Sequence, residues 1–175
     1  MRCDDDNLVY FKSSDVLGKA MDKDLIMNEA FALAREAAEE GEVPVGAVVT
    51  LDGEIVGRGR NRREKSKNAL AHAEIEAIND ACKNLGGWRL WQCEMFVTLE
   101  PCPMCAGAII NSRLKKVTYG ATDHKAGSCR SVINLFDLPY NHKPEIESGY
   151  RAEEASELLS DFFKKLRDKK RATNS

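Results

Sequence analysis

The sequence has few histidines, no long apolar run and no large excess of charge. Only three of its 175 residues are histidine, so a histidine within a motif carries weight. No apolar run approaches the roughly 20 residues that a membrane-spanning helix requires, which excludes a protein of that class. The formal net charge of -2 argues against a protein that coats nucleic acid indiscriminately, although it does not describe local patches.

The sequence also lacks the signs of a disulfide framework, although it has six cysteines. The N-terminal stretch has no apolar segment typical of a secretory signal peptide. Two of the cysteines form a Cys-x-x-Cys pair, for which a histidine is available elsewhere in the chain. We therefore expect reduced thiols and a cytoplasmic location.

A chain of 175 residues with 43% hydrophobic content is long enough for one domain and too short for two ordinary ones. The pattern of apolar residues predicts that this domain is of the α/β class. Residues 1–20 show no sustained periodicity and are expected to form a disordered extension. Residues 21–168 form the domain, and residues 169–175 are expected to form a basic, flexible tail. Helices are predicted over 22–40, 72–85, 103–113 and 152–170, with partial helix over 130–138, and strands over 43–49, 54–59, 94–99, 115–120 and 145–148.

Two motifs supply the chemistry: a His-Ala-Glu motif that begins at His72, and a Pro-Cys-Pro-Met-Cys motif that ends at Cys105. His72, Cys102 and Cys105 are good zinc ligands. A structural zinc site normally has four protein ligands, whereas three leave a position for water, which zinc acidifies towards neutral pH. Glu74 could move a proton to and from that water without binding the metal. The motifs therefore predict a catalytic zinc site, although the ligand types do not exclude iron.

Both motifs are expected at helix N-termini. Pro103 suits the first turn of a helix, which places Cys102 and Cys105 one turn apart on one face. The positive end of that helix favours their thiolate forms. The apolar face of the helix after His72 is predicted to comprise Ile75, Ile78, Cys82 and Leu85.

Two segments of the chain are basic. In most proteins such a segment is a solvated loop, and basic residues suit the end of any helix. Near the catalytic site of an enzyme that acts on a nucleic acid, such residues would instead contact phosphates. The first contains Arg58, Arg60, Arg62, Arg63, Lys65 and Lys67 with only Glu64 opposing them, and the second covers residues 164–171 at the end of the last predicted helix.

The sequence resembles the tRNA adenosine deaminases, which convert the wobble adenosine of a tRNA anticodon to inosine. The resemblance covers about residues 24–167. Besides the zinc motifs, which a whole deaminase superfamily shares, it rests on the blocks 42–48, 97–108 and 159–163. It implies a three-layer cytidine deaminase-like α/β fold, with a five-stranded mixed sheet between helices. Residues 21–168 would then form a single zinc-dependent deaminase domain.

The resemblance also implies the catalytic roles. His72, Cys102 and Cys105 would hold one zinc ion per subunit. Hydroxide on the zinc would attack C6 of adenine, and Glu74 would act as the proton shuttle. The reaction is a hydrolytic deamination of a base that has left its stack.

The substrate contacts that the resemblance implies are Asn61, Val45, Asp123 and Phe163. Asp123 would meet the ribose beside the flipped base, and a contact to the 2′-hydroxyl would favour RNA over DNA. Phe163 would lie on a C-terminal helix that lines the tRNA. The implied partners are a tRNA anticodon stem-loop and a second copy of the chain in a homodimer.

Other functions stay open at this point. A free-base or nucleotide deaminase of the guanine or cytidine type would use the same zinc chemistry. His72 stands where cytidine deaminases usually carry a cysteine, and a guanine deaminase would not need Asp123 or a basic C-terminal helix. A non-catalytic zinc-scaffolded RNA-binding subunit would not need Glu74. The loop after Asp123 departs from the family pattern at Cys129 and Arg130, which leaves the anticodon contacts there open.

Overall fold

The computed structural model describes residues 22–173, so the extension expected over residues 1–20 lies outside the described range. Most predicted elements are present with boundaries close to those expected. The elements are α1 (Lys23–Glu39), β1 (Gly46–Leu51), β2 (Glu54–Arg60), α2 (Arg63–Ser66), α3 (Ala73–Leu85), β3 (Glu94–Leu99), α4 (Pro103–Ser112), β4 (Lys116–Ala121), a 3-10 turn (Leu135–Asp137), β5 (Glu145–Ser148) and α5 (Ala152–Thr173).

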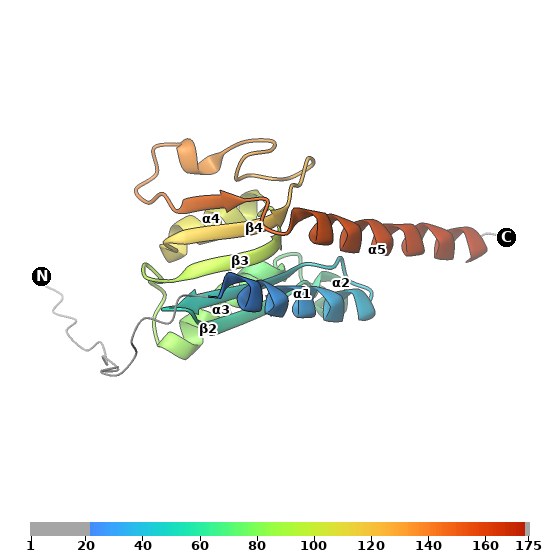
Figure 1. Ribbon diagram of the computed structural model, residues 1–175, viewed down its shortest axis with the longest axis horizontal. Helices are drawn as coiled ribbons and strands as arrows, with labels where there is room; N and C mark the ends of the chain where they lie inside the picture. The colour runs from blue at the N-terminus through green and yellow to red at the C-terminus, as the bar shows by residue number, and fades with distance from the viewer. Residues whose placement is uncertain (1–21, 174–175) are drawn as a thin grey trace, which may run out of the picture.

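The five strands form one mixed sheet in the order β2-β1-β3-β4-β5, which confirms the predicted sheet (Figure 1). β1 is antiparallel to both β2 and β3, whereas β3, β4 and β5 are parallel. The carboxyl ends of β2, β3 and β4 therefore meet at one edge of the sheet. Ligands of open α/β sheets bind outside such an edge, and the segments that leave it here contain the zinc motifs.

Helices cover both faces of the sheet. α3 and α4 pack on one face, where the larger core includes Ala77, Ile109 and Val97, and α1 and α5 pack on the other around Phe31 and Phe96. This arrangement is the predicted three-layer fold. No helix in the described part of the chain has the length and apolar character needed to cross a membrane.

The buried face of α3 differs from the predicted one. Ile78 is buried as expected, but Leu85 is 40% exposed, and the other buried positions are Ala73, Glu74, Ala77 and Ala81. The cause lies in β2. A Cβ at Gly57 would lie 2.4 Å from the Ala77 carbonyl oxygen, and a Cβ at Gly59 would lie 2.1 Å from the Ala73 carbonyl oxygen. The small residues of α3 therefore face β2, where the backbones are too close for larger side chains.

Replacing Gly59 with alanine should destabilise the protein by about 3 kcal/mol, because the new methyl group overpacks the contact with α3. Gly87→Ala is the matched control, since nothing lies within 4 Å of a Cβ at Gly87. Urea unfolding of both variants measures the difference. Equal stabilities would contradict the close packing of β2 and α3.

The C-terminal helix is longer than predicted. α5 continues to Thr173, so residues 169–173, which were expected in a flexible tail, are helical. Only Ala155 of α5 is fully buried, and every side chain from Lys164 to Thr173 is exposed. The second half of α5 projects beyond the sheet (Figure 1).

Candidate metal centre and active site

The three predicted metal ligands lie at the starts of two helices. His72 is the N-cap residue of α3 and Cys102 is the N-cap residue of α4, with Pro103 in the first turn as predicted. Neither side chain caps its helix by a hydrogen bond in the way that Asp22 caps α1. Cys105 follows one turn into α4 and is fully buried. The structure brings all three ligand atoms within 4.8 Å of one another.

The spacing of these atoms fits a tetrahedral metal ion. His72 Nδ1 lies 3.7 Å from Cys102 Sγ and 3.6 Å from Cys105 Sγ. Zinc bonds of about 2.3 Å to sulfur and about 2.0 Å to nitrogen put N and S roughly 3.6 Å apart at tetrahedral angles. The residues present therefore fit a metal that has three protein ligands and an open fourth position.

The charge state of the two thiols supports the same conclusion. A hydrogen bond from Cys105 lowers the pKa of Cys102 to about 4, with a further contribution from His72. The same hydrogen bond, together with burial, raises the pKa of Cys105. Cys102 is thus the more acidic of the two thiols. A thiol that binds a metal is deprotonated, so a cation held by both sulfurs would take the place of the Cys105 proton.

Glu74 lies beside the cluster and is 4% exposed. Burial raises the pKa of its carboxyl to about 7, and Cys102, His72 and Cys105 all act on its charge. A carboxyl group of this kind can accept a proton and release it again near neutral pH. It stands in the first turn of α3, where the helix dipole favours the carboxylate.

Asn61 and Val45 lie next to each other at the carboxyl end of β2. The Asn61 backbone N–H donates to the Val45 carbonyl at 3.1 Å, and both residues are buried. The Arg62 N–H donates to the carbonyl of Ala71 at 3.0 Å. Because Ala71 precedes His72, this bond holds Asn61 near the start of α3.

Asp123 lies in the loop that follows β4, at the same edge of the sheet. Its Oδ1 accepts hydrogen bonds from the backbone N–H groups of Lys125 at 2.9 Å and Ala126 at 3.2 Å. The carboxylate of Asp123 therefore also caps its own loop. Its backbone N–H donates to the carboxylate of Glu100 at 3.1 Å.

Glu100 is a residue that the sequence reasoning missed. It is 2% exposed and lies two positions before Cys102. Burial opposes its ionisation, but hydrogen bonds from Ser131 and from backbone N–H groups outweigh it and lower the pKa. The sequence shows only a glutamate directly before the Pro-Cys motif, and this position does not indicate which groups would donate hydrogen bonds to it.

Several basic side chains in the segment before His72 form salt bridges, which its sequence did not reveal. It contains a short helix, α2, and its opposing charges come from α1 and the C-cap residue Glu40 rather than from Glu64. Arg58 pairs with Glu29 at 2.6 Å, Arg60 with Glu36 at 3.2 Å and Glu40 at 2.9 Å, and Lys65 with Glu40 at 3.0 Å. Half of the six predicted phosphate contacts are thus already paired with carboxylates.

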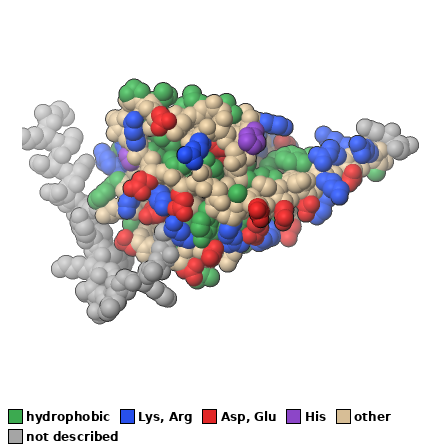
Figure 2. Space-filling view, turned by 45° about the horizontal axis from the view of Figure 1, so that its top comes forward, with side chains coloured by type: hydrophobic (Ala, Val, Ile, Leu, Met, Phe, Trp, Pro, Cys, Tyr) green, Lys and Arg blue, Asp and Glu red, His purple; other side chains and the backbone are tan. Residues whose placement is uncertain are grey.

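Phe163 lies on α5, away from the zinc motifs in the sequence and 41% exposed. It makes an edge-to-face contact with Phe162, with the ring centroids 5.4 Å apart. Lys and Arg side chains gather towards the tip of this helix (Figure 2). The projecting half of α5 therefore combines aromatic and basic groups on an exposed surface.

Known proteins are similar to this chain in sequence and in fold. Residues 21–167 match the MafB19-like deaminase family. The chain is 49% identical over 150 residues to a tRNA-specific adenosine deaminase of Bacillus subtilis (strain 168), covering 85% of this chain and 93% of that protein. A solved structure from studies of A-to-I editing by tRNA:A34 deaminases at the wobble position of transfer RNA is 42% identical. It has a TM-score of 0.76 and covers 78% of this chain and 99% of that one.

The chain belongs to the tRNA-specific adenosine deaminase family. This confirms the predicted family and fold. A guanine deaminase from Bacillus subtilis also matches, at 33% identity with a TM-score of 0.57 over 85% of this chain and 95% of that one. The fold is common to both kinds of deaminase. In sequence, the chain is more similar to the tRNA-specific adenosine deaminase (49% identity) than to the guanine deaminase (33% identity).

Proposed function

We propose that the chain hydrolyses adenosine to inosine at the wobble position of a tRNA anticodon. The observation that carries this proposal is the cluster of His72, Cys102 and Cys105 with buried Glu74 beside it. This site occurs in a chain 49% identical to a tRNA-specific adenosine deaminase. The cluster supports the chemistry, and the family supports the substrate.

His72 Nδ1 and the two thiolates would hold Zn²⁺. Bound Zn²⁺ would polarise a water molecule and make it a nucleophile near neutral pH. His72 would bind the ion through Nδ1 as the neutral imidazole, with its proton on Nε2. The starts of α3 and α4 keep these three ligands in place, because Ala73 of α3 packs closely against Gly59 of β2 and α4 follows β3 after a short turn.

Glu74 carries the protons of the reaction. It accepts a proton from the attacking water, whose oxygen forms a bond to C6 of adenine. It returns this proton to the ring nitrogen, then takes the remaining proton from the new hydroxyl on C6 and delivers it to the amino group, which leaves as ammonia when the C6–N bond breaks. Adenosine and water thus give inosine and ammonia. Burial of Glu74 excludes bulk water from these transfers.

We assign substrate contacts to Asn61, Val45, Asp123 and Phe163. The backbone hydrogen bond between Asn61 and Val45, and the position of Asp123 after β4 at the same edge of the sheet, support a common substrate surface. A base in the anticodon loop can leave its stack at a cost of a few kcal/mol. A contact from Asp123 to the ribose 2′-hydroxyl would select RNA.

The proposal includes a homodimer that acts in the cytoplasm. All five cysteines among residues 22–173 are free, which agrees with a reducing compartment. Sedimentation at several protein concentrations would test the dimer.

The zinc-loaded protein should form inosine at the wobble position of an adenosine-bearing anticodon stem-loop, and should leave free adenosine, guanine and cytidine unchanged. The assay follows inosine by nuclease digestion and mass spectrometry, and ammonia release for the free compounds. Ammonia from guanine alone would keep the zinc chemistry but replace the substrate. No reaction with any compound would favour a non-catalytic RNA-binding subunit.

A further inference from the structure

A single buried carboxylate organises the loop after β4. Glu100 Oε1 accepts hydrogen bonds from three consecutive backbone N–H groups, those of Cys129 at 3.2 Å, Arg130 at 2.8 Å and Ser131 at 3.0 Å. Its Oε2 accepts from the Asp123 N–H at 3.1 Å and from the Ser131 hydroxyl. The Glu100 carboxylate thus binds both ends of the nine-residue loop 123–131.

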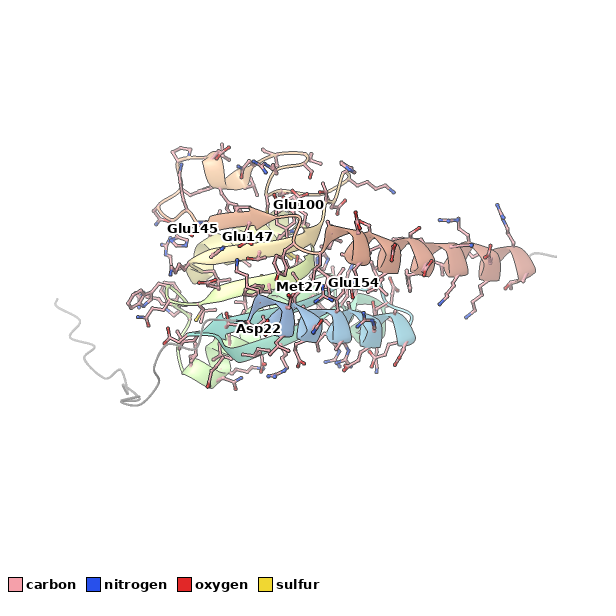
Figure 3. The ribbon with its side chains drawn as sticks, viewed as in Figure 1. Asp22, Met27, Glu100, Glu145, Glu147 and Glu154 are labelled. Atoms are coloured by element: carbon pink, nitrogen blue, oxygen red, sulfur yellow. The ribbon has the colours of Figure 1, made fainter. Side chains whose placement is uncertain are left out.

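The loop encloses Glu100 closely. A Cβ at Gly127 would lie 2.4 Å from the Glu100 carboxylate and 2.5 Å from the Asp123 carbonyl oxygen, so glycine is required for this approach. Figure 3 shows Glu100 between the end of the sheet and the loop that follows β4.

The same loop is tied directly to the turn that leads to the zinc ligands. The Ser128 N–H donates to the Pro101 carbonyl at 2.9 Å, and the Glu100 N–H donates to the Ala121 carbonyl at 2.8 Å. Glu100 and Pro101 immediately precede Cys102 in the chain. The hydrogen bonds therefore fix the distance from Asp123 to the start of α4 through a few short covalent and hydrogen-bonded links.

We propose that Glu100 is a positioning residue, which holds the loop 123–131, and with it Asp123, in register with the Cys102 end of the zinc site. The inference rests on the proposed function, in which Asp123 contacts the ribose of the reacting nucleotide. Glu100 itself, being buried beneath the loop, acts on the substrate only through Asp123. A displacement of about 1 Å at a reacting group can cost about 10²-fold in rate.

Glu100→Gln keeps the shape of the side chain but replaces one acceptor oxygen with an NH₂ group, which opposes N–H donors. We expect kcat/KM for the stem-loop to fall about 10²-fold, mainly in kcat, because the rest of the tRNA still supplies binding energy. Zinc content should stay at one ion per chain. The loop amides of residues 123–131 should exchange hydrogen faster than in the unaltered protein.

The decisive comparison is a double-mutant cycle with Asp123→Asn. If Glu100 acts through Asp123, both single variants lower the preference for RNA over a DNA stem-loop, and Glu100→Gln adds nothing to Asp123→Asn. A purely structural role would give additive losses of activity and no change in the RNA preference. Additive effects, or an unchanged preference in Glu100→Gln, would overturn the inference.

Glu94→Gln is the matched control, because Glu94 begins β3, the strand that ends just before Glu100, and its buried Oε2 has no hydrogen-bond partner within residues 22–173. It should leave kcat/KM unchanged.

Ser131→Ala serves as the test variant if Glu100→Gln fails to fold. It removes one hydrogen-bond donor to Glu100 and keeps the carboxylate, so we expect a smaller loss of kcat/KM than in Glu100→Gln. If the unaltered protein does not act on tRNA, the proposed function fails, whereas hydrogen exchange still tests the Glu100 link. Unchanged exchange of the loop in Glu100→Gln would refute that link by itself.

Discussion

Replacing Glu74 with glutamine should lower kcat by about 10³-fold while zinc remains bound, because general acid–base catalysis of this kind contributes about 10²- to 10⁴-fold. The amide cannot accept the proton of the attacking water or return it to the base. The side chain keeps its volume, so the buried position beside the cluster stays filled. Single-turnover rates of inosine formation, with the zinc content of the same sample, measure the effect.

Glu76→Gln is the matched control for Glu74→Gln. Both glutamates lie in the first turn of α3, so both substitutions remove the same favourable interaction with the helix dipole. Only Glu74 lies beside the cluster of His72, Cys102 and Cys105, and Glu76→Gln should keep its rate. Wild-type turnover in zinc-loaded Glu74→Gln would remove Glu74 from the mechanism.

Replacing Cys105 with serine should abolish both zinc binding and activity. The two remaining side chains, His72 and Cys102, are too few for a stable site, and a buried hydroxyl is a poor ligand for zinc. We expect metal analysis to show a stoichiometry near zero and inosine formation to fall below detection.

The melting temperature gives an independent measure of the same prediction. A ligand that binds the folded chain raises its stability with concentration, so added zinc should raise the melting temperature of the zinc-depleted protein but not that of Cys105→Ser. Cys82→Ser is the control, because Cys82 packs partly buried against the core. It should keep its zinc and its zinc-dependent melting temperature. A zinc-loaded, active Cys105→Ser protein would show that this thiol is not a ligand.

The sequence alone predicted the cluster of His72, Cys102 and Cys105, which the structure brings together, and the strand pattern. These features are local: His72 and Glu74 lie two residues apart at the start of one helix, and Cys102 and Cys105 one turn apart at the start of another. The hairpin of β1 and β2 is likewise local, because its turn is formed by Asp52 and Gly53, which both have positive φ. Short-range geometry is encoded in neighbouring residues, and so it could be predicted.

Only the tertiary structure decided which residues face one another across the chain. The basic residues at Arg58 and Arg60 looked free until α1 placed Glu29 and Glu40 against them. The buried face of α3 was set by the backbone of β2. Glu100 acquired its partners from a loop more than twenty residues away. Such contacts depend on the order of strands in the sheet, which brings distant segments to one edge, and no local pattern in the sequence records that order.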